Sequence, residues 1–308
     1  MDREVPVTQP VGRILCPVDF SHFSESALRH ALLLARWLSE PVRLLWVQHG
    51  SQAPLDGFPP LTTSIHAVPD WRERVLAKLS AFGEPARAAG VEVEVEVEEG
   101  EPVPTILRRA REIPAGVVVL GTHGHGGFET LFLGSVTEKV VRKATCPVLA
   151  VPRPVAEHDE RGVPRVRTVL CPVDFSESSR TALSYAVALC RVSGASLVAL
   201  HVVEALPVED FAENDHFNVP EFRAILESDA RKGLSELVGS VGIPNRPVRE
   251  VVVSGKAWRR IVETAREVGA GLVVMGVQGR SVLDRALFGS TTHHVIRAAP
   301  CAVLAAHA

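Results

Sequence analysis

The heptapeptide LCPVDFS occurs twice in this chain, at residues 15–21 and again at 170–176. The same displacement of 155 residues relates a second pair of segments, GTHGHGGFETLFLGS at 121–135 and GVQGRSVLDRALFGS at 276–290. Distant segments that repeat at one displacement indicate that a whole structural unit has been duplicated. The 308 residues are enough for two domains of about 150 residues each. We therefore predict two similar domains, 1–156 and 157–308, joined by the proline-rich and charged segment PRPVAEHDERGVPR.

Apolar and polar segments follow the same order in both halves. Each half begins with a short apolar run, 13–19 or 167–174, which predicts a strand buried on both faces. Apolar residues spaced three and four apart predict the next helix, with Ser21 or Ser24 as the first cap. Further strands are expected at 42–47, 91–97, 116–120 and 148–151, and at 197–202, 248–253, 271–275 and 302–305. Further helices are expected at 70–89, at 104–112 and from 134, and at 220–238, at 257–268 and from 289.

Alternating strands and helices predict an α/β fold. Each half should form a doubly wound, Rossmann-like parallel sheet of five strands with helices on both faces. Strict Val/Glu alternation in 91–97 predicts a strand with one solvent-facing side, at a sheet edge. The basic cluster Arg108, Arg109 and Arg111 is interpreted as a solvated helix face, because the chain carries a net charge of −3.

Composition argues against several classes of partner and location. The chain has no long run of one charge sign, which argues against nucleic acid as a partner. No apolar stretch approaches the roughly 20 residues that span a bilayer, and MDREVPVTQP lacks the apolar core of a signal peptide, so we predict a cytoplasmic protein with no membrane partner. Four of the five cysteines lie at equivalent positions of the repeat, in or beside apolar strands. They are interpreted as small buried hydrophobes, with a reactive thiol as the alternative.

The two repeated segments predict a ligand site. In a doubly wound sheet, ligands bind at the carboxyl ends of the strands, where the strand order reverses. The loop after the fourth strand has the pattern GxxG, nine residues, then Gly-Ser, and it leads into a helix. Glycine allows close backbone approach, and the first amides of a helix attract anions, so this loop predicts a phosphate site. The alternative is that these are structural turn glycines.

The phosphate site predicts roles for particular residues. The amides of Gly124, Gly134 and Ser135 with the Ser135 hydroxyl, or of Gly279, Gly289 and Ser290, would hold phosphates. Asp19 and Asp174 would accept hydrogen bonds from ribose or base, or would instead cap the following turn. An apolar pocket for the base is expected from Val18, Val47 and Leu120, and from Val173, Val202 and Met275.

At these residues the chain resembles the universal stress protein family, in its tandem two-domain form, and specifically the branch that binds ATP. The resemblance covers nearly all of both halves, and it rests on the PVD strand end, the second strand ending at Val47 or Val202, and the glycine loop. It implies ATP as the ligand, with or without magnesium, at two sites per chain. The family's branch without nucleotide lacks these glycines. The resemblance also implies that the halves pair through their last strands as a dimer within one chain; a further homodimer stays open.

The residues expected to bind nucleotide form two equivalent sets. They are Pro17, Val18, Asp19, Val47, Leu120, Gly121, Gly124, Gly134, Ser135 and Val136 in the first half, and Pro172, Val173, Asp174, Val202, Met275, Gly276, Gly279, Arg280, Gly289, Ser290 and Thr291 in the second. Arg280 stands where the first loop has His125 and would add a charge beside phosphate.

No reaction is predicted from the sequence. Hydrolysis needs a base and usually a metal held by carboxylates, and the loop supplies neither plainly, nor is there a GxxxxGK[ST] motif. His123 and His125 are interpreted as loop residues, because the second copy has Gln278 and Arg280 there. The leading hypothesis is a stress-response regulator in which ATP occupancy changes the surface offered to partners. The alternatives are a slow ATPase or nucleotidyl transferase with Asp19 or Asp174 recruiting magnesium, and a nucleotide-independent interaction module.

Overall fold

The structure, a computed structural model, describes residues 12–49, 70–123, 133–152, 162–204, 219–241, 247–277 and 289–307. These residues belong to two compact units, here called the first unit, within Pro10–Pro164, and the second unit, within Arg165–Ala308. The division predicted between residues 156 and 157 falls outside the described residues and stays a prediction.

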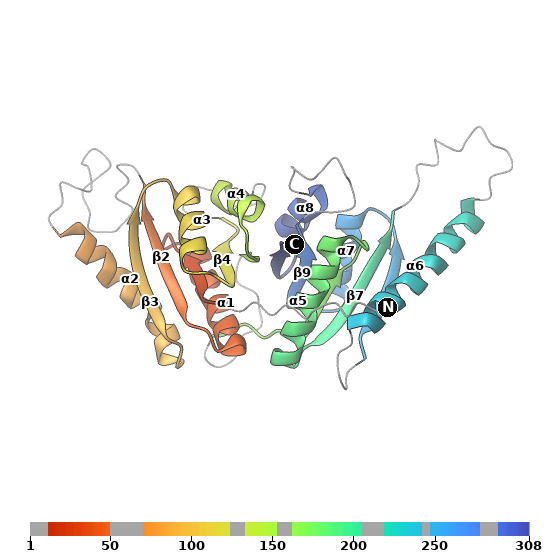
Figure 1. The fold of residues 1–308 in the computed structure, drawn as a ribbon, viewed down its shortest axis with the longest axis horizontal. Helices are drawn as coiled ribbons and strands as arrows, with labels where there is room; N and C mark the ends of the chain where they lie inside the picture. Colours follow the sequence, from red (N-terminus) through yellow and green to blue (C-terminus); the bar gives the residue numbers. More distant parts are fainter. Residues whose placement is uncertain are drawn as a thin grey trace. The chain divides into compact units, whose positions relative to one another are not determined.

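Strands and helices alternate through the first unit (Figure 1). Its elements are β1 (Ile14–Pro17), α1 (His22–Leu38), β2 (Val42–Gln48), α2 (Trp71–Ala88), β3 (Val93–Glu99), α3 (Pro102–Glu112), β4 (Val117–Gly121), α4 (Ser135–Lys143) and β5 (Val148–Val151).

The second unit repeats this order. Its elements are β6 (Thr168–Pro172), α5 (Glu177–Ser193), β7 (Ser196–Val203), α6 (Val219–Val241), β8 (Arg249–Ser254), α7 (Ala257–Glu267), β9 (Leu272–Gly276), α8 (Ser290–Ala298) and β10 (Ala302–Ala306). The alternation predicted from the hydrophobic pattern is therefore confirmed in both units, with element ends differing by a few residues from those expected.

The strand order within each unit is that of a doubly wound sheet. It is β3-β2-β1-β4-β5 in the first unit and β8-β7-β6-β9-β10 in the second. Every strand pair within a unit is parallel. The chain adds strands in one direction up to the third and then crosses to the other side of the first, so right-handed crossovers put the helices on opposite faces. In agreement, α1 contacts α2 and α3 contacts α4.

Burial explains why the first strand of each unit lies at its centre. All four residues of β1 are buried, and Leu15 and Leu170 are 0% exposed. Helices on both faces of a parallel sheet cover both rows of strand side chains, which accounts for continuous apolar runs instead of alternation. Serine caps the helix that follows. The Ser21 hydroxyl accepts from the Ser24 amide at 3.3 Å, and the Ser176 hydroxyl accepts from the Ser179 amide at 3.1 Å.

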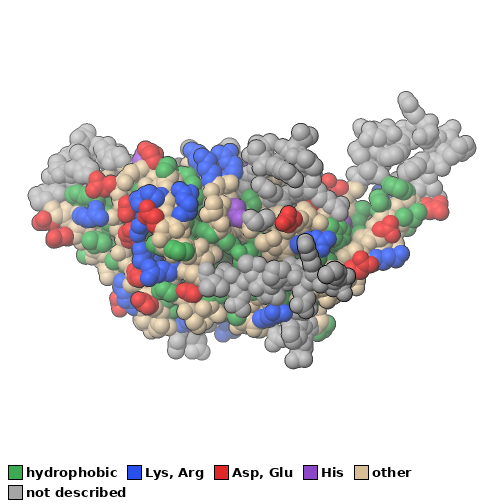
Figure 2. Space-filling model, in the orientation of Figure 1, with side chains coloured by type: hydrophobic (Ala, Val, Ile, Leu, Met, Phe, Trp, Pro, Cys, Tyr) green, Lys and Arg blue, Asp and Glu red, His purple; other side chains and the backbone are tan. Residues whose placement is uncertain are grey.

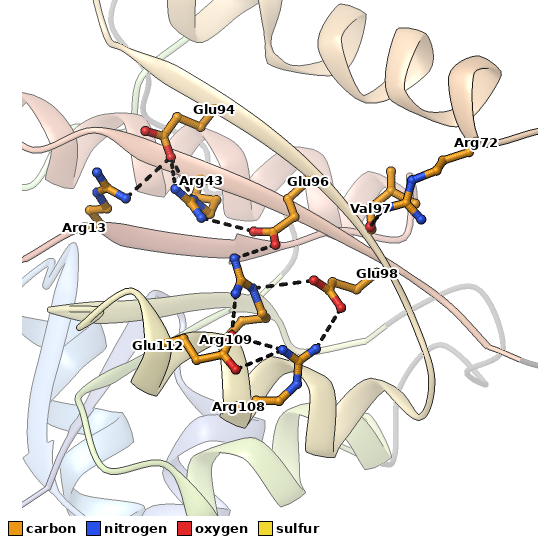
Figure 3. Close-up of polar contacts among 10 residues, drawn as sticks. All are labelled: Arg13, Arg43, Arg72, Glu94, Glu96, Val97, Glu98, Arg108, Arg109 and Glu112. Atoms are coloured by element: carbon orange, nitrogen blue, oxygen red, sulfur yellow. Dashed lines mark hydrogen bonds and ion pairs between the residues drawn. The ribbon is translucent and has the colours of Figure 1, made fainter.

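The Val/Glu strand, β3, lies at the edge of its sheet as predicted. Its glutamate side is nevertheless not simply solvated, because it faces a row of arginines (Figure 3). Arg109 of α3 lies between Glu96, at 2.5 Å, and Glu98, at 3.8 Å, and Arg43 of β2 pairs with Glu94 and Glu96. The interpretation of Arg108, Arg109 and Arg111 as a solvated helix face is confirmed for the exposed Arg108 and Arg111 and is wrong for Arg109, whose side chain is only 17% exposed. Arg108 and Arg109 both pair with carboxylates of β3. Acidic and basic side chains also alternate over this region of the surface (Figure 2).

Within the described ranges, no helix is both long enough and apolar enough to cross a bilayer.

Candidate functional site

The strand order places a switch point, where the chain changes direction across the sheet, in each unit. β1 pairs with β4, and β6 pairs with β9, while the connections leave these neighbours in opposite directions. A ligand site is expected at the carboxyl ends of such a strand pair. Asp19 follows β1 and Gly121 ends β4, so the tertiary structure brings the starts of the two repeated sequence segments to the carboxyl ends of these neighbouring strands. Asp174 and Gly276 are the equivalent pair in the second unit.

Asp174 is held by the turn that follows it. One of its oxygens, Oδ1, accepts from the Ser176 amide at 3.0 Å and from the Ser176 hydroxyl at 2.5 Å. Phe175 between them has a left-handed backbone, with φ of 65°. Such a conformation is strained for a bulky residue and is found at sites where the surrounding structure holds it. In the described part of the chain the other oxygen, Oδ2, has no hydrogen-bond partner, so Asp174 keeps an acceptor for a ligand.

Asp19 is also held by the turn that follows it, with one more serine. Its Oδ1 accepts from the Ser21 amide at 3.0 Å, the Ser21 hydroxyl at 2.6 Å and the Ser24 hydroxyl at 2.5 Å. Phe20 has a φ of 63°. The alternative interpretation, in which the aspartates organise the following turn, is confirmed by these contacts. At Asp174 the turn and a ligand would use different oxygens, so the two roles are compatible.

The first glycine of each loop pattern is needed for packing. A Cβ on Gly121 would lie 2.8 Å from the Cβ of Phe23, and a Cβ on Gly276 would lie 2.9 Å from the carbonyl of Ser178. In each unit the strand end therefore runs directly against the helix that follows the first strand. This contact explains why both positions are glycine without any ligand. It agrees with the alternative that these glycines are structural.

The later Gly-Ser pair begins the final helix. Gly134 and Gly289 are the N-caps of α4 and α8, and among the described residues no side chain caps either helix. The Gly134 amide donates to the Thr122 carbonyl at 2.7 Å, and the Gly289 amide donates to the Val277 carbonyl at 3.2 Å. These two amides are therefore engaged within the protein. The amides of the first helical turn, beginning at Ser135 and Ser290, are the better donors for an anion.

A threonine in each of these helices ties it to the preceding strand. The Thr137 hydroxyl donates to the Gly121 carbonyl at 2.6 Å, and the Thr292 hydroxyl donates to the Gly276 carbonyl at 3.0 Å. Both threonines are buried. Sequence reasoning missed this pair, although the displacement of 155 residues relates the two threonines and could have revealed them.

In the second unit, a cavity of about 1060 Å³ lies at the carboxyl ends of β6 and β9. All the predicted residues of this half that the structure describes line it: Pro172, Val173, Asp174, Val202, Met275, Gly276, Gly289, Ser290 and Thr291. Gly279 and Arg280 lie outside the described residues. The cavity therefore joins an apolar wall, an aspartate and a helix N-terminus, which are the three components expected from the sequence.

The predicted residues of the first half lie at the equivalent edge. Val18 and Leu120 are 6% and 5% exposed, Pro17 is buried, Val47, Gly134 and Val136 are half-buried, and Ser135 is exposed. Gly124 and His125 lie outside the described residues. His123 is a neighbour of Phe23, with ring centroids 5.0 Å apart, and its Nδ1 lies 3.0 Å from the Thr122 hydroxyl.

Other cavity residues were not foreseen from the sequence. They come chiefly from Phe175, from His201 on β7 and from one side of α6. The Nδ1 atom of His201 lies 2.7 Å from the Val173 carbonyl, and its ring packs on Phe175 with centroids 4.6 Å apart. On α6, the three- and four-residue spacing of Ala230, Gly233 and Leu237 was a signal of one shared helix face.

Burial disfavours a reactive thiol in the described part of the chain, which leads to a direct test. Burial raises the pKa of Cys16 and of Cys301 to about 12, and it also raises the pKa of Cys171. Because only the thiolate is nucleophilic, we expect iodoacetamide at about pH 8 to leave these three thiols unmodified in the native protein. Peptide mass mapping before and after unfolding checks this result. Rapid native labelling of any of the three would contradict it.

Comparisons with known proteins agree with this arrangement. The sequence profile described as "Universal stress protein family" matches residues 10–152 and again 165–307. A universal stress protein of Mycobacterium tuberculosis is 31% identical over 208 residues, 67% of this chain and 65% of that relative, so the match spans less than two thirds of the relative's length. Another, from Mycobacterium bovis, is 29% identical over 248 residues, 80% of this chain and 74% of the relative.

Solved structures extend the comparison to the fold. The crystal structure of a universal stress protein from Archaeoglobus fulgidus has a TM-score of 0.69 and 23% identity, and the match covers 96% of this chain and 98% of that one. Family and fold thus agree over both halves. The chain belongs to the universal stress protein family.

Proposed function

We propose that this protein is an ATP-binding stress-response regulator with one nucleotide site in each half. ATP occupancy would change the surface that it offers to protein partners, which requires two states with different affinities for ATP. The proposal places the protein in the cytoplasm and pairs its halves through their last strands. The observation that supports it most directly is the cavity of the second unit, in which nine residues expected to bind nucleotide lie together.

The apolar wall and Asp174 suit an adenosine. A volume of about 1060 Å³ is slightly above the range of about 300–1,000 Å³ typical of small-molecule sites. Val173 and Met275 are 3% and 5% exposed, so they are firmly packed and offer a preformed apolar surface for a base. The Oδ2 atom of Asp174 would accept a hydrogen bond from a ribose hydroxyl.

The start of α8 suits the phosphates. Among the described residues that line the cavity, four are acidic and one, Arg180 of α5, is basic. The acidic ones all lie outside α8: Asp174 after β6, Glu204 after β7, and Asp229 and Glu236 on α6. An anion is therefore disfavoured beside those carboxylates and favoured at the N-terminus of α8, where the helix dipole is positive and no described side chain caps the amides. The exposed Ser290 hydroxyl lies at this end.

Replacing Asp174 with asparagine tests the proposal with little disturbance of the turn. The asparagine side chain would keep an oxygen for Ser176 but would replace the ligand-facing acceptor with an amide donor. Because a hydrogen bond to a charged group contributes about 1.5–3 kcal/mol, we expect ATP to bind the second site of Asp174→Asn about 10- to 100-fold more weakly. Titration calorimetry on the full chain measures this affinity. Asp19→Asn provides the same test for the first site.

Controls separate binding from folding and from catalysis. Ser176→Ala removes a helix cap and should lower the melting temperature of the unliganded protein more than Asp174→Asn, which keeps an oxygen for Ser176. Absence of both adenine absorbance in the purified protein and binding heat with ATP would sink the proposal. Slow release of ADP and phosphate by the wild type, lost in the double aspartate variant, would instead support the ATPase alternative.

A further inference from the structure

The outermost strand of each unit pairs on one side only. β3 pairs with β2, and β8 pairs with β7, and each lies at an end of the strand order. The free side of such an edge strand presents backbone N–H and C=O groups to which another strand can add, and proteins usually cover or block these groups. The two units differ in what covers them.

The backbone groups on the free side of β8 can be identified from the hydrogen bond at its end. The Gly255 amide donates to the Val203 carbonyl of β7 at 3.0 Å, so this amide points toward β7. Successive residues of a strand direct their N–H and C=O groups to alternate sides. The N–H and C=O groups of Glu250 and Val252 therefore point away from the sheet. Within the part of the chain that the structure describes, these groups have no hydrogen-bond partner.

In the first unit, arginines of α2 block the equivalent edge. By the displacement of 155 residues, Val97 of β3 is the counterpart of Val252. The Arg72 guanidinium donates to the Val97 carbonyl at 2.7 Å (Figure 3). Arg87 donates to the Val93 carbonyl, at the other end of the same strand, at 3.4 Å. Charged side chains over an edge are a usual means of preventing it from pairing with another chain.

In the second unit, neither arginine has an equivalent. Glu227 of α6 stands at the position of Arg72, and Gly242 stands at the position of the second arginine. A carboxylate cannot donate to a carbonyl. The Glu227 carboxylate instead accepts from the Ser254 hydroxyl at 2.7 Å and pairs with Arg231 at 3.4 Å. No described side chain therefore blocks the outward carbonyls of β8.

The side chains of β8 make this open edge suited to another strand. Val251, Val252 and Val253 are half-buried, whereas Val97 at the blocked edge is only 2% exposed. β-branched residues pack well against neighbours on a pleated surface. An added strand would thus pair the free backbone groups and cover valine surface that now faces water.

We propose that β8 pairs with β8 of a second copy of this chain, in an antiparallel dimer. A two-fold axis perpendicular to the sheet brings two identical edges together in this orientation, with the same patch used on both sides. Arg249 and Glu250 are the exposed residues of β8 and carry opposite charges, so charge selects neither an acidic nor a basic foreign strand. The valines match those of the same strand. This interface goes beyond the proposed nucleotide sites and does not depend on them.

The charges also restrict the register of the pair. Like charges directly opposite each other destabilise neighbouring strands, so Glu250 should not face Glu250 of the second copy. With Val251 on the two-fold axis, Glu250 faces Val252 and Arg249 faces Val253, and no like charges meet. Because β8 has only six residues, the dimer should be weak and should depend on protein concentration.

Hydrogen exchange on the full chain without nucleotide tests the pairing directly. The outward amides of Glu250 and Val252 should exchange rapidly in dilute protein and become protected as the concentration rises from about 1 μM to about 1 mM. Peptides from β3 should show no such change. Sedimentation equilibrium over the same range measures the dimer. Because ATP is absent, failure of ATP to bind leaves both results unaffected.

Two substitutions should close the edge by different means. Val252→Pro removes an outward N–H without removing a bond to β7, and proline is tolerated at such edge positions. Glu227→Arg restores the residue of the first unit, whose guanidinium blocks the equivalent carbonyl. We expect each to weaken dimerisation about tenfold or more, because each leaves backbone groups of both copies without a partner.

Glu267→Arg is the matched control for the charge change. Glu267 is exposed at the end of α7, so its replacement should leave dimerisation unchanged. All three variants should have melting temperatures close to that of the wild type in dilute solution. If Val252→Pro fails to fold, Glu227→Arg decides in its place.

Four results would overturn the self-pairing of β8. One is a chain that stays monomeric up to about 1 mM. Another is a dimer in which the β8 amides exchange as fast as in the monomer. A third is equal dimerisation in Glu227→Arg and Glu267→Arg. The last is protection of β8 that appears only with an added valine-rich peptide and not with rising protein concentration, which would assign the edge to a foreign strand.

Discussion

Replacing Gly276 with valine is expected to destabilise the second unit by about 1–3 kcal/mol or more, since overpacking forces backbone or rotamer shifts of that cost. The new Cβ would lie 2.9 Å from the backbone carbonyl carbon and oxygen of Ser178, atoms that cannot move independently of α5. The cap from Ser176 holds this helix in place. Thermal and denaturant unfolding of the full chain, followed by circular dichroism, measure the effect.

The matched control is Gly239→Val on α6. Gly239 has nothing within 4 Å of an added Cβ, so we expect a change of less than about 0.5 kcal/mol, as for other surface positions. Equal stabilities of Gly276→Val and the wild type would show that strand and helix do not pack as closely as the structure has them. ATP affinity is measured only on variants that stay folded, because loss of the fold also removes the site.

Removing Arg109 is expected to have the second large effect, in the first unit. The Arg109 side chain is only 17% exposed, and it lies among three carboxylates, those of Glu96, Glu98 and Glu112 (Figure 3). Arg109→Met keeps much of the aliphatic length but leaves Glu96 and Glu98 close together with less positive charge. We expect a loss of about 1–3 kcal/mol, the cost of leaving partly buried polar groups without a partner.

The pH dependence of stability should identify the cause of that loss. Burial alone would raise the pKa of Glu96, but hydrogen bonds from Arg109 and the charges of Arg109 and Arg43 outweigh it and hold the pKa below the ordinary 4.5. A carboxylate with a lowered folded-state pKa contributes stability above its unfolded pKa and loses it as the pH falls through the folded value. The wild type should therefore lose stability on acidification, and Arg109→Met should lose less.

Arg111→Met is the control for this experiment. Arg111 lies on the same helix and is exposed, so its removal should change stability by less than about 0.5 kcal/mol and should leave the pH profile unaltered. If Arg109→Met matched Arg111→Met in both stability and pH profile, the arginine–glutamate cluster would have no measurable stabilising role. Raised salt should reduce the stability loss in Arg109→Met only in part, since the Arg109 and Glu96 side chains are only 17% and 19% exposed.

The predicted ligand site illustrates how much a repeated sequence conveys. In each unit, the aspartate after the first strand and the glycine that ends the fourth strand lie at the carboxyl end of the sheet: Asp19 with Gly121, and Asp174 with Gly276. This follows because strand order in a doubly wound fold follows from the alternation of elements. The roles of individual glycines could not be predicted from the order of the elements. Gly276 is required by a contact with Ser178 on α5, and the Gly289 amide is used by the Val277 carbonyl, and no sequence spacing reveals either contact.

The edge strand β3 is a second example of what the sequence can and cannot predict. Alternating Val and Glu in β3 correctly predicted an edge position, because the period of a strand is local to its own sequence. Whether the glutamates face water or arginine depended on α3 and β2, which bring Arg109 and Arg43 to the same side. The charge pattern of β3 alone does not predict which residues of other elements its glutamates contact.

From the sequence alone, one could predict the duplication, the order of strands and helices, and that Asp174 and Gly276 lie at the carboxyl end of one sheet. Tertiary structure alone decided which other side chains line the cavity of the second unit, among them Phe175, His201 and one face of α6. The physical reason is that periodicity is a property of neighbouring residues, whereas a cavity is the volume left over when side chains from distant segments pack. The spacing of Ala230, Gly233 and Leu237 marks one face of α6, but only the packed fold shows that this face lines the cavity.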